Sequence, residues 1–384
     1  MEYISHFKEN TTLILLGAGN SSRFCSQNHL PKKQWLRSGY DPLWLTVLDK
    51  FLSFGFTNII LTASSKECCL MRNYTSYPVV SGGETRTQSI LNALENVKTP
   101  YVLISDIARY NPQKEVVQSL FEELYNDSSL SCIAPYLPAV DTTLSCTNGY
   151  LNRNELKQIQ TPQLSKVEIL KTALQKGDFS DESSAIASFG GKVAYILGSP
   201  LMDKLTYDYE LSSLTLPPPS KVNFVGQGID IHAFTPNKPM VLGGVRIPCD
   251  FGFKAHSDGD VLLHSITDAI LGAIGAGDIG EWFPDTHEEF KNADSKLLLK
   301  EVFDFSCSVG YEIINLDLNI LAQTPKISPY KDAIKSSLSS LLSLPKYAIN
   351  IKATTGEELG FIGRGEGICV MSCINMQFID WSKQ

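Results

Sequence analysis

Leu13-Ile14-Leu15-Leu16-Gly17-Ala18-Gly19-Asn20-Ser21-Ser22-Arg23-Phe24 joins an apolar run directly to a turn that contains glycine. The pattern predicts a β-strand, a turn and the start of a helix. Glycines let the backbone approach a phosphate closely, and unpaired N–H groups at a helix N-terminus bind anions. The third glycine of a dinucleotide fingerprint is missing, since Ser22 takes its place, and no Gly-Lys-Ser/Thr ending follows. The stretch alone fits a phosphate site and an ordinary strand–turn–helix unit equally well.

Short apolar runs like this one recur through residues 1–216 and alternate with helical stretches. The alternation predicts an α/β fold with a Rossmann-like, mostly parallel sheet and flanking helices. Residues 221–384 differ in character and predict a smaller mixed α/β unit. Its expected elements are a helix at about 258–276 and strands near 313–321, 347–353 and 368–377. The apolar runs of the first block are Thr12–Leu16, Asn58–Thr62, Tyr101–Ser105 and Ser131–Ala134.

The two blocks meet at Leu211–Ser220, which reads LSSLTLPPPS. Three successive prolines cannot continue a helix or a central strand, so they favour an extended, semi-rigid spacer. A chain of 384 residues is also long for a single core. We therefore expect a first domain at 1–211, a linker at 212–220 and a second domain at 221–384.

Composition limits the possible partners. A formal net charge of −8 argues against nonspecific binding to nucleic acid. Nine cysteines without a paired framework fit a reducing compartment. The sequence has neither a signal peptide pattern nor an apolar stretch of membrane-spanning length. We expect a cytoplasmic protein without nucleic-acid or membrane partners.

A cluster of metal-binding residue types begins the second block. Asp230 and His232 are two positions apart on a predicted strand, so both point to the same face. His264 follows on the predicted helix. Two imidazoles and a carboxylate form a common catalytic zinc set, with the fourth position left for substrate or water. The alternative is that two of the histidines are ordinary core or surface residues.

The predicted helix adds further polar groups around His264. Ser257 precedes it in a capping-box-like arrangement with Asp260. Asp260, His264 and Asp268 are spaced to share one face, which suits a metal ligand oriented by an outer carboxylate. A capped helix with a charged stripe would explain Asp260 equally well.

Several ordered motifs in the first block resemble one enzyme family. They are Gly-x-Gly-x-x-x-Arg, Pro-Lys-x-Gln, Gly-Gly-x-x-Arg-x-x-Ser, Asp-x-Ala-Arg, Asp-Thr and Thr-Pro-Gln. In this order they resemble the cytidylyltransferases of the methylerythritol phosphate route to isoprenoids, over about residues 12–210. The resemblance implies catalytic roles for Arg23, Lys33 and Lys204. It also implies substrate contacts at Gly17, Gly19, Gly82, Gly83, Arg86, Ser89, Asp106, Arg109, Asp141, Thr142, Arg153 and Ser180.

Two departures from that family pattern are visible. An extra residue in Pro31-Lys32-Lys33-Gln34 leaves two lysines as candidates, and we prefer Lys33 because it directly precedes Gln34. Ser180 replaces the more common threonine and keeps the hydroxyl group.

Motifs of the second block resemble 2-C-methyl-D-erythritol 2,4-cyclodiphosphate synthase, over about residues 222–380. They include Asp-x-His, Ala-His-Ser-Asp-Gly-Asp-x-x-x-His, Phe-Pro-Asp-Thr, Ala-Gln-x-Pro-Lys, Lys-Ala-Thr-Thr and Gly-Phe-x-Gly-Arg-x-Glu-Gly. The resemblance implies Zn²⁺ on Asp230, His232 and His264, a second ion (Mg²⁺ or Mn²⁺) near Glu357, and a homotrimer with shared sites. Thr355 would act at the reacting diphosphate. Other implied substrate contacts are His256, Ser257, Asp278, Asp285, Ala322, Lys326, Glu357, Phe361 and Arg364.

Departures here are Gly356, where a third threonine is usual, and His287, where an acid is common. Neither belongs to the zinc set. Together the two resemblances predict a bifunctional enzyme that acts on CTP and methylerythritol phosphates, with Mg²⁺ or Mn²⁺ at both sites. The expected assembly is a trimer of C-terminal domains, with pairing through the N-terminal domains as a further option. The alternatives are a single-activity nucleotidyltransferase with a zinc-stabilised oligomerisation domain, and a nucleotide-binding scaffold.

Overall fold

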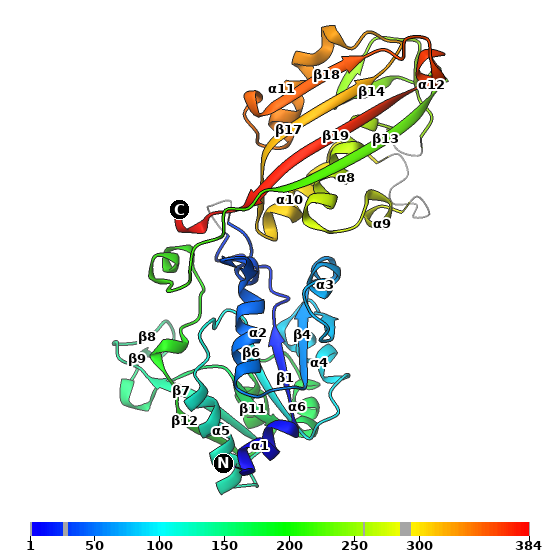
Figure 1. The fold of residues 1–384 in the computed structure, drawn as a ribbon. Coiled ribbons are helices and arrows are strands. Elements are labelled where there is room, and N and C mark those ends of the chain that lie inside the picture. The colour runs from blue at the N-terminus through cyan, green and yellow to red at the C-terminus, as the bar shows by residue number, and fades with distance from the viewer. Residues whose placement is uncertain (1, 26–29, 256–257, 285–292, 384) are drawn as a thin grey trace. The chain divides into compact units, whose positions relative to one another are not determined.

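A computed structural model describes residues 2–25, 30–255, 258–284 and 293–383. The chain divides into two compact units, the main part of the first ending at Pro217 and that of the second beginning at Pro218. Figure 1 shows both units as ribbons. Within the described ranges, none of the helices has the length and apolar character needed to cross a bilayer.

The first unit is built on a mostly parallel sheet in the strand order β10-β7-β11-β6-β1-β4-β5, with β12 beside β7. The strand of the opening sequence, β1, runs parallel to both β4 and β6. The sheet departs from the expected pattern at β11 and β10, which run antiparallel to their neighbours. The strands are β1 (Thr11–Leu16), β4 (Ile59–Ala63), β5 (Val79–Ser81), β6 (Tyr101–Asp106), β7 (Cys132–Pro138), β10 (Lys157–Ile159), β11 (Gln163–Lys166) and β12 (Val193–Leu197).

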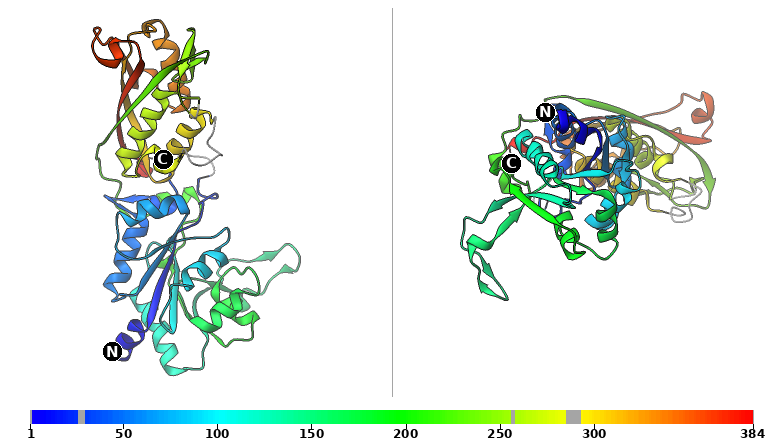
Figure 2. Two further views of the ribbon diagram at one scale, coloured as in Figure 1. Left: turned by 90° about the vertical axis from the view of Figure 1, so that its right-hand side faces the viewer. Right: turned by 90° about the horizontal axis from the view of Figure 1, so that it is seen from below.

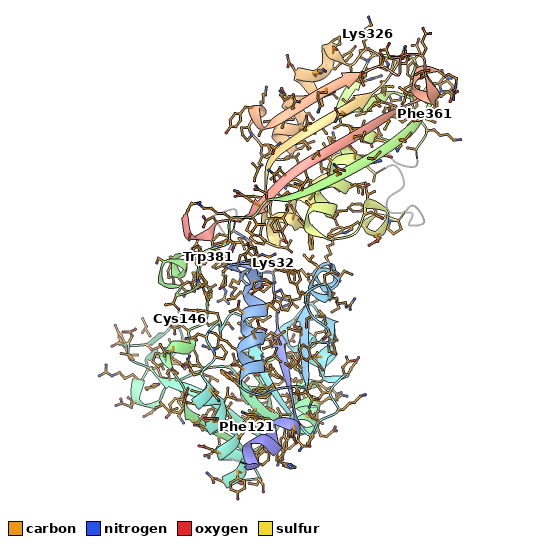
Figure 3. The ribbon with its side chains drawn as sticks, in the orientation of Figure 1. Lys32, Phe121, Cys146, Lys326, Phe361 and Trp381 are labelled. Carbon is orange, nitrogen blue, oxygen red and sulfur yellow. The ribbon has the colours of Figure 1, made fainter. Side chains whose placement is uncertain are left out.

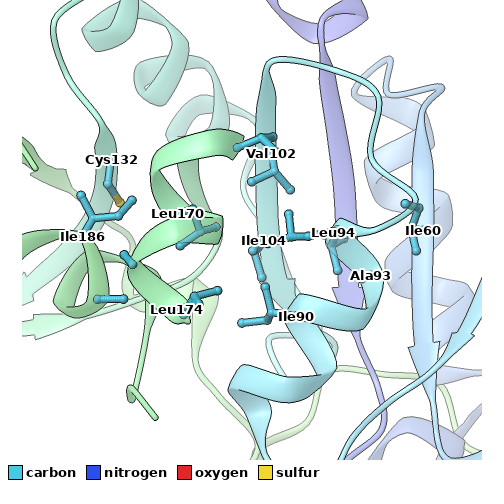
Figure 4. Packing of buried hydrophobic residues seen from close by; sticks show 14 residues of the cluster. Ile60, Ile90, Ala93, Leu94, Val102, Ile104, Cys132, Leu170, Leu174 and Ile186 are labelled. Carbon is cyan, nitrogen blue, oxygen red and sulfur yellow. The ribbon is translucent and has the colours of Figure 1, made fainter. Parts of the chain in front are cut away.

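Helices cover this sheet and bury its apolar side chains. Figure 4 shows part of the core, in which Ile14 and Ile104 of the central strands belong to one cluster with Leu94, Leu170 and Ile186 of the helices. This packing confirms the predicted arrangement of parallel strands and crossover helices. The helices are α1 (Glu2–Glu9), α2 (Leu43–Ser53), α3 (Ser65–Arg72), α4 (Arg86–Leu94), α5 (Lys114–Asn126), α6 (Val167–Leu174) and α7 (Glu182–Ser188).

A small hairpin extends from the first unit. Its strands are β8 (Leu144–Ser145) and β9 (Gly149–Tyr150), and Figure 2 shows it reaching away from the sheet. Cys146 at its tip is labelled in Figure 3. The hairpin exposes Leu144 and Tyr150 to solvent.

The second unit has a mixed sheet in the order β16-β13-β19-β17-β18. The neighbours β13–β19 and β19–β17 are antiparallel, whereas β17 and β18 are parallel. The smaller mixed α/β unit expected from the sequence is therefore present. Its strands are β13 (Phe224–Pro236), β16 (Phe251–Phe253), β17 (Tyr311–Leu321), β18 (Ile349–Thr354) and β19 (Gly367–Phe378). A separate hairpin pairs β14 (Met240–Leu242) with β15 (Val245–Ile247).

Helix α8 (Val261–Ile274) packs directly on β13 and β19. The close approach depends on glycine, because a Cβ at Gly226 would collide with the carbonyl oxygen of Ala269. A Cβ at Gly228 would collide with the carbonyl oxygen of Ser265. The other helices of this unit are α9 (Ile279–Trp282), α10 (Ser295–Ser308), α11 (Lys331–Leu341) and α12 (Gly360–Gly363).

The start of α8 corrects one prediction. The helix begins at Val261 rather than near 258, and Asp260 is itself the N-cap, since its side chain accepts a hydrogen bond from the N–H of Leu263. Asp260 also accepts from the N–H groups of Gly243 and Gly244, and it is fully buried. The predicted place of Asp260 as the third residue of a capping box is therefore wrong, because Asp260 is the N-cap, and Ser257 lies outside the described residues.

Candidate active sites in the two units

The first unit contains a pocket of about 610 Å³ at the carboxyl ends of β1, β4 and β6. In open α/β sheets this is the edge where ligands bind. Ten of the predicted site residues line it, although they come from segments far apart in the sequence. They are Gly17, Gly19, Arg23, Lys33, Gly82, Gly83, Arg86, Ser89, Asp106 and Lys204.

The loop after β1 is held by a side chain whose role the sequence did not reveal. Gln34 is only 5% exposed, and its amide nitrogen donates to the carbonyl oxygen of Gly19 at 3.2 Å. Its amide oxygen accepts from the hydroxyl of Ser21 at 3.3 Å, and that hydroxyl accepts from the N–H of Lys33 at 3.1 Å. Ser21 has a φ of 54°, a backbone conformation that is uncommon outside glycine. Gln34 thus fixes the shape of the loop that carries Arg23.

The structure separates the two candidate lysines. Lys33 lines the pocket, and its ammonium group donates to the carbonyl oxygen of Leu205 at 3.0 Å. Burial lowers the pKa of Lys33, and the nearby charges of Lys204 and Arg23 lower it further. Lys32 forms an ion pair with the buried Glu67 at 2.9 Å instead. The cations that line the pocket are Arg23, Lys33, Arg86 and Lys204.

Asp106, at the end of β6, is the acidic group among these cations. Its Oδ2 lies 2.6 Å from the ammonium nitrogen of Lys204, and its Oδ1 lies 3.4 Å from Nε of Arg86. Burial alone would raise the pKa of this carboxyl, but Arg86 and Lys204 outweigh it and hold the pKa at about 2. Asp106 is therefore ionised at neutral pH and is available to a cation or to hydroxyl donors.

Glycines form one wall of the pocket. A Cβ at Gly82 would collide with the Cβ of Ala18 and would lie 2.9 Å from Oγ of Ser89. The N–H of Gly83 donates to that same hydroxyl at 3.1 Å. Across the pocket, a Cβ at Gly17 would lie 2.6 Å from Cδ1 of Ile107 and 2.9 Å from the carbonyl oxygen of Thr62. These positions have no room for a side chain.

Other predicted residues of the first unit do not line this pocket. Arg109 donates from Nη1 to the carbonyl oxygen of Met202 at 2.6 Å and from Nη2 to that of Ile159 at 3.4 Å. It is thus tied to the backbone beneath the site. The remaining residues are exposed, three of them near the β8–β9 hairpin: Asp141, Thr142, Arg153 and Ser180.

In the second unit, Asp230, His232 and His264 converge as predicted. One ligand atom from each lies within 4.8 Å of the others. Oδ2 of Asp230 lies 3.2 Å from Nε2 of His232 and 3.1 Å from Nδ1 of His264. These contacts hold the pKa of Asp230 well below its usual range, although burial opposes the shift. Burial would lower the pKa of His232, but the same carboxylate outweighs it and raises the pKa.

Each histidine of this cluster is oriented through its other ring nitrogen. Nδ1 of His232 lies 3.0 Å from the carbonyl oxygen of Gly259. Nε2 of His264 lies 2.8 Å from the hydroxyl of Ser295, which in turn donates to Asp258 at 2.5 Å. Such outer partners fix the tautomer and direct the remaining nitrogen toward a metal. Ser295 and Asp258 fill the role that we predicted for Asp260 and Asp268. Asp260 caps α8, and Asp268 accepts from the N–H of Ile279.

The remaining predicted residues of the second unit lie on loops and at the ends of strands and helices, except Phe361, which lies on α12. The hydroxyl of Thr355 donates to the carboxylate of Glu357 at 2.6 Å, and Glu357 has a φ of 47°. Arg364 pairs with Glu366, and the buried Ala322 donates from its N–H to the carbonyl oxygen of Thr354. Asp278 caps α9. Figure 3 labels Lys326 and Phe361, both exposed. His256, Ser257, Asp285 and His287 lie outside the described residues.

Strand register relates these loops to the metal-binding cluster. Thr354 pairs with Leu321, Leu321 with Cys369, and Cys369 with Ile231. The four residues form one row across β18, β17, β19 and β13, so the segment from Thr355 onward begins at the same end of the sheet as Asp230 and His232. Three strand spacings separate the ends of this row by about 14 Å.

Comparisons with known proteins agree with the division into two units. Residues 11–215 match the family model of 2-C-methyl-D-erythritol 4-phosphate cytidylyltransferase, and residues 224–377 match that of the YgbB family. The "Bifunctional enzyme IspD/IspF" of Aliarcobacter butzleri is 50% identical over 379 residues, which cover 98% of this chain and 100% of that relative. The same-named enzyme of Nitratiruptor is 49% identical over 97% of this chain and 99% of that relative. A solved structure of the bifunctional IspDF from Campylobacter jejuni matches with a TM-score of 0.84 and 46% identity, over 97% of this chain and 99% of that one.

Proposed function

Since this chain belongs to the bifunctional IspD/IspF enzymes, we propose that two separate sets of residues perform its two reactions. The chain transfers CMP from CTP to 2-C-methyl-D-erythritol 4-phosphate with release of pyrophosphate. It also cyclises 4-diphosphocytidyl-2-C-methyl-D-erythritol 2-phosphate with release of CMP. The pocket of the first unit is assigned to the first reaction, and the Asp230–His232–His264 cluster to the second. A single-activity nucleotidyltransferase or a nucleotide-binding scaffold would not need both of these sets of residues.

The first assignment rests on the concentration of cations around the pocket. Transfer of a nucleotidyl group depends on holding the attacking phosphate in line and neutralising charge at the α-phosphorus. Arg23 and Lys33 are proposed to stabilise the negative charge that develops there, and Lys204 to bind the incoming phosphate. The lowered pKa of Lys33 is consistent with an anion-binding site, because burial and the neighbouring cations Lys204 and Arg23 disfavour a further positive charge there.

The nucleoside part of CTP is assigned to the glycine wall. Gly82, Gly83 and Ser89 would contact cytosine and ribose, because all three line the pocket and the glycine backbone packs closely against Ala18 and Ser89 there. Asp106 fits a divalent ion, since its carboxylate is buried yet ionised. Mg²⁺ or Mn²⁺ held by Asp106 would neutralise negative charge on the triphosphate of CTP.

The second assignment rests on the donor set. Two imidazole nitrogens and one carboxylate oxygen fit Zn²⁺, and their outer partners are in place. Zinc held there would polarise a phosphate oxygen of the substrate. No covalent nucleophile is needed, because the 2-phosphate of the substrate attacks its own β-phosphorus. Thr355 and Lys326 are proposed to hold the diphosphate in line, which removes most of the entropic barrier.

A second ion, Mg²⁺ or Mn²⁺, is assigned to Glu357. The exposed carboxylate is already oriented by the Thr355 hydroxyl, so hydroxyl and carboxylate can face the same phosphates. Asp278, Ala322, Phe361 and Arg364 are assigned to the ribose, cytosine and diphosphate on the evidence of their motifs. His256, Ser257 and Asp285 are assigned to the substrate on the same basis.

A homotrimer is proposed for the second units. The row of paired residues separates the backbone of Thr354 by about 14 Å from that of Ile231, which lies between two of the zinc ligands, within one chain. The two reacting phosphates of the substrate, one assigned to each of these places, must come within about 3–3.5 Å of each other. A neighbouring chain that supplies the missing half would complete the site. The nine free thiols fit assembly in a reducing cytoplasm.

The two reactions are not consecutive. The second substrate carries a 2-phosphate that the first product lacks, so a kinase must act between them. The fusion therefore does not imply transfer of an intermediate from one site to the other.

Zinc removal tests the second assignment against the oligomerisation alternative. We expect a chelator to stop CMP release while cytidylyl transfer continues, and added Zn²⁺ to restore the release. Loss of assembly with no change in CMP release per assembled chain would contradict a catalytic zinc site. Size-exclusion chromatography with light scattering reads the assembly in the same samples.

A further inference from the structure

A buried acid lies behind the nucleotide pocket and has no role in the reaction as described so far. Glu182 is the first residue of α7, and its side chain is 0% exposed. It does not line the pocket. Its carboxylate oxygen Oε1 lies 2.8 Å from Nη1 of Arg86, which does line the pocket. A buried carboxylate is costly without a partner, and the Arg86 guanidinium is the basic group that faces this one.

Arg86 connects Glu182 to the acid of the pocket. Nη1 of its guanidinium contacts Glu182 at 2.8 Å, and Nε contacts Asp106 at 3.4 Å. Asp106 in turn contacts Lys204 at 2.6 Å. The four side chains form a row from the core to the pocket in which acidic and basic residues alternate. The shorter contact is the one to Glu182, so the guanidinium is held closer to the core than to Asp106.

The backbone around both partners is also fixed. The hydroxyl of Thr85, which caps α4, donates to Asp178 at 2.8 Å. The N–H of Phe179 donates to the hydroxyl of Thr87 at 3.1 Å. The segment that leads into α7 is therefore tied to the first turn of α4 by contacts on both sides of Arg86. The backbone of the first turn of α4 and the segment before α7 therefore cannot separate without breaking them.

We propose that Glu182 is a positioning residue for cytidylyl transfer, which holds the Arg86 guanidinium in place at the wall of the pocket, where Arg86 also contacts Asp106. The inference rests on the proposed assignment of this pocket to CTP. Burial works against the charge on Arg86, but Glu182 and Asp106 outweigh it and hold its pKa above the ordinary value. Without Glu182, the planar cation would have Asp106 as its remaining carboxylate in this row and would no longer be fixed at this position.

A double-mutant cycle on the full-length chain tests this role. CTP binding in the presence of Mg²⁺ is measured by isothermal titration calorimetry, together with kcat and KM for pyrophosphate release, for E182Q, R86K and R86K/E182Q. We expect E182Q to weaken CTP binding about tenfold. In the R86K background, we expect E182Q to weaken CTP binding by less than a further factor of about two, because lysine cannot bridge both carboxylates. S183A, at the adjacent buried position of α7, is the matched control and should bind CTP as the wild type does.

A simple structural role gives a different pattern. If Glu182 only stabilised the fold, E182Q would lower the melting temperature. Its effect on the free energy of CTP binding would then add to that of R86K. Such additivity, or CTP binding by folded E182Q equal to that of the wild type, would overturn the proposal. If E182Q did not fold, E182D, which keeps the charge on a shorter side chain, would replace it in the same cycle with the same two readings. Wild-type protein that failed to bind CTP would overturn the pocket assignment and this inference together, so the two failures are distinguishable.

Discussion

Oδ2 of Asp230 lies 3.1 Å from Nδ1 of His264, although the two residues are 34 positions apart in the sequence. The contact joins strand β13 to helix α8. It depends on the close packing of these two elements, which the glycines at 226 and 228 permit. Both imidazoles face the same carboxylate, so that the three side chains can hold one divalent cation between them. The packing of β13 against α8 thus brings the three ligand residues together.

Replacing His264 should separate the two activities. We expect His264→Ala to lose bound zinc, from about one ion per chain to nearly none, and to abolish CMP release from the cyclisation substrate. Cytidylyl transfer should stay within about twofold of the wild type, because no residue of the first pocket is changed. Zinc content by elemental analysis and the two turnover rates check this. His6→Ala, which removes an exposed histidine of α1, is the control. Parallel loss of both activities in folded protein would contradict the assignment.

Replacing Lys33 should impair activity, whereas replacing the adjacent Lys32 should impair stability. Lys33→Met removes a cation from the pocket, so kcat/KM for cytidylyl transfer should fall at least about a hundredfold with little change in melting temperature. Lys32→Met leaves the buried Glu67 without its cation and should lower the free energy of unfolding by roughly 2–4 kcal/mol. The folded fraction of Lys32→Met should still turn over. Steady-state kinetics and denaturant unfolding decide between them, and an inactive but stable Lys32→Met would reverse the assignment.

The glycine wall predicts a steric effect on nucleotide binding. Gly82→Ala places a methyl group against Ala18 and Ser89, so CTP binding should weaken at least about tenfold. Gly177→Ala is the matched control, because a Cβ there meets no atom within 4 Å. Calorimetric titration with CTP measures both variants. Equal affinities would show that the base does not bind along this wall.

Acid should destabilise the first unit through Asp106. Its pKa is about 2 in the folded protein, below the 3.8 of an unperturbed aspartate, so its ionised form contributes stability above pH 4. This contribution is lost as the pH falls from about 4 toward 2, and it corresponds to about 2 kcal/mol. Unfolding of the first unit is identified in calorimetry as the transition that CTP shifts. We expect the free energy of this transition to fall more between about pH 4 and pH 2 in the wild type than in Asp106→Asn. Identical pH dependence in both proteins would contradict the charge pairing.

Local patterns in the sequence were sufficient for much of this account. The apolar runs of the first block became β1, β4, β6 and β7, and those of the second became β17, β18 and β19. Asp230 and His232 share a strand face, as their spacing required. The preference for Lys33 over Lys32 agrees with the position of Lys33 in the pocket and with the pairing of Lys32 to Glu67. In each case the decisive information lies within a few neighbouring residues.

Contacts between distant segments could not be predicted in the same way. Ser295 orients His264 across 31 positions of sequence and itself donates to Asp258 across 37 positions, and no spacing in the sequence signals either contact. Gln34 belongs to the Pro31-Lys32-Lys33-Gln34 stretch and Glu182 lies two residues after Ser180, but their burial against Gly19 and Arg86 depends on how distant segments pack. The expected capping box failed because Asp260 receives three backbone N–H groups, two of them from Gly243 and Gly244. Long-range packing, not residue type, decides these roles.

A ³¹P NMR time course on the full-length chain tests the central claim that one chain carries two independent sites. Wild type, Lys33→Met and His264→Ala each receive CTP, Mg²⁺ and methylerythritol 4-phosphate in one tube, and the phosphorylated cytidyl intermediate in another. We predict pyrophosphate in the first tube for wild type and His264→Ala only, and cyclodiphosphate with CMP in the second for wild type and Lys33→Met only. A variant that lost both reactions while folded, or a wild type that performed only one, would contradict the account.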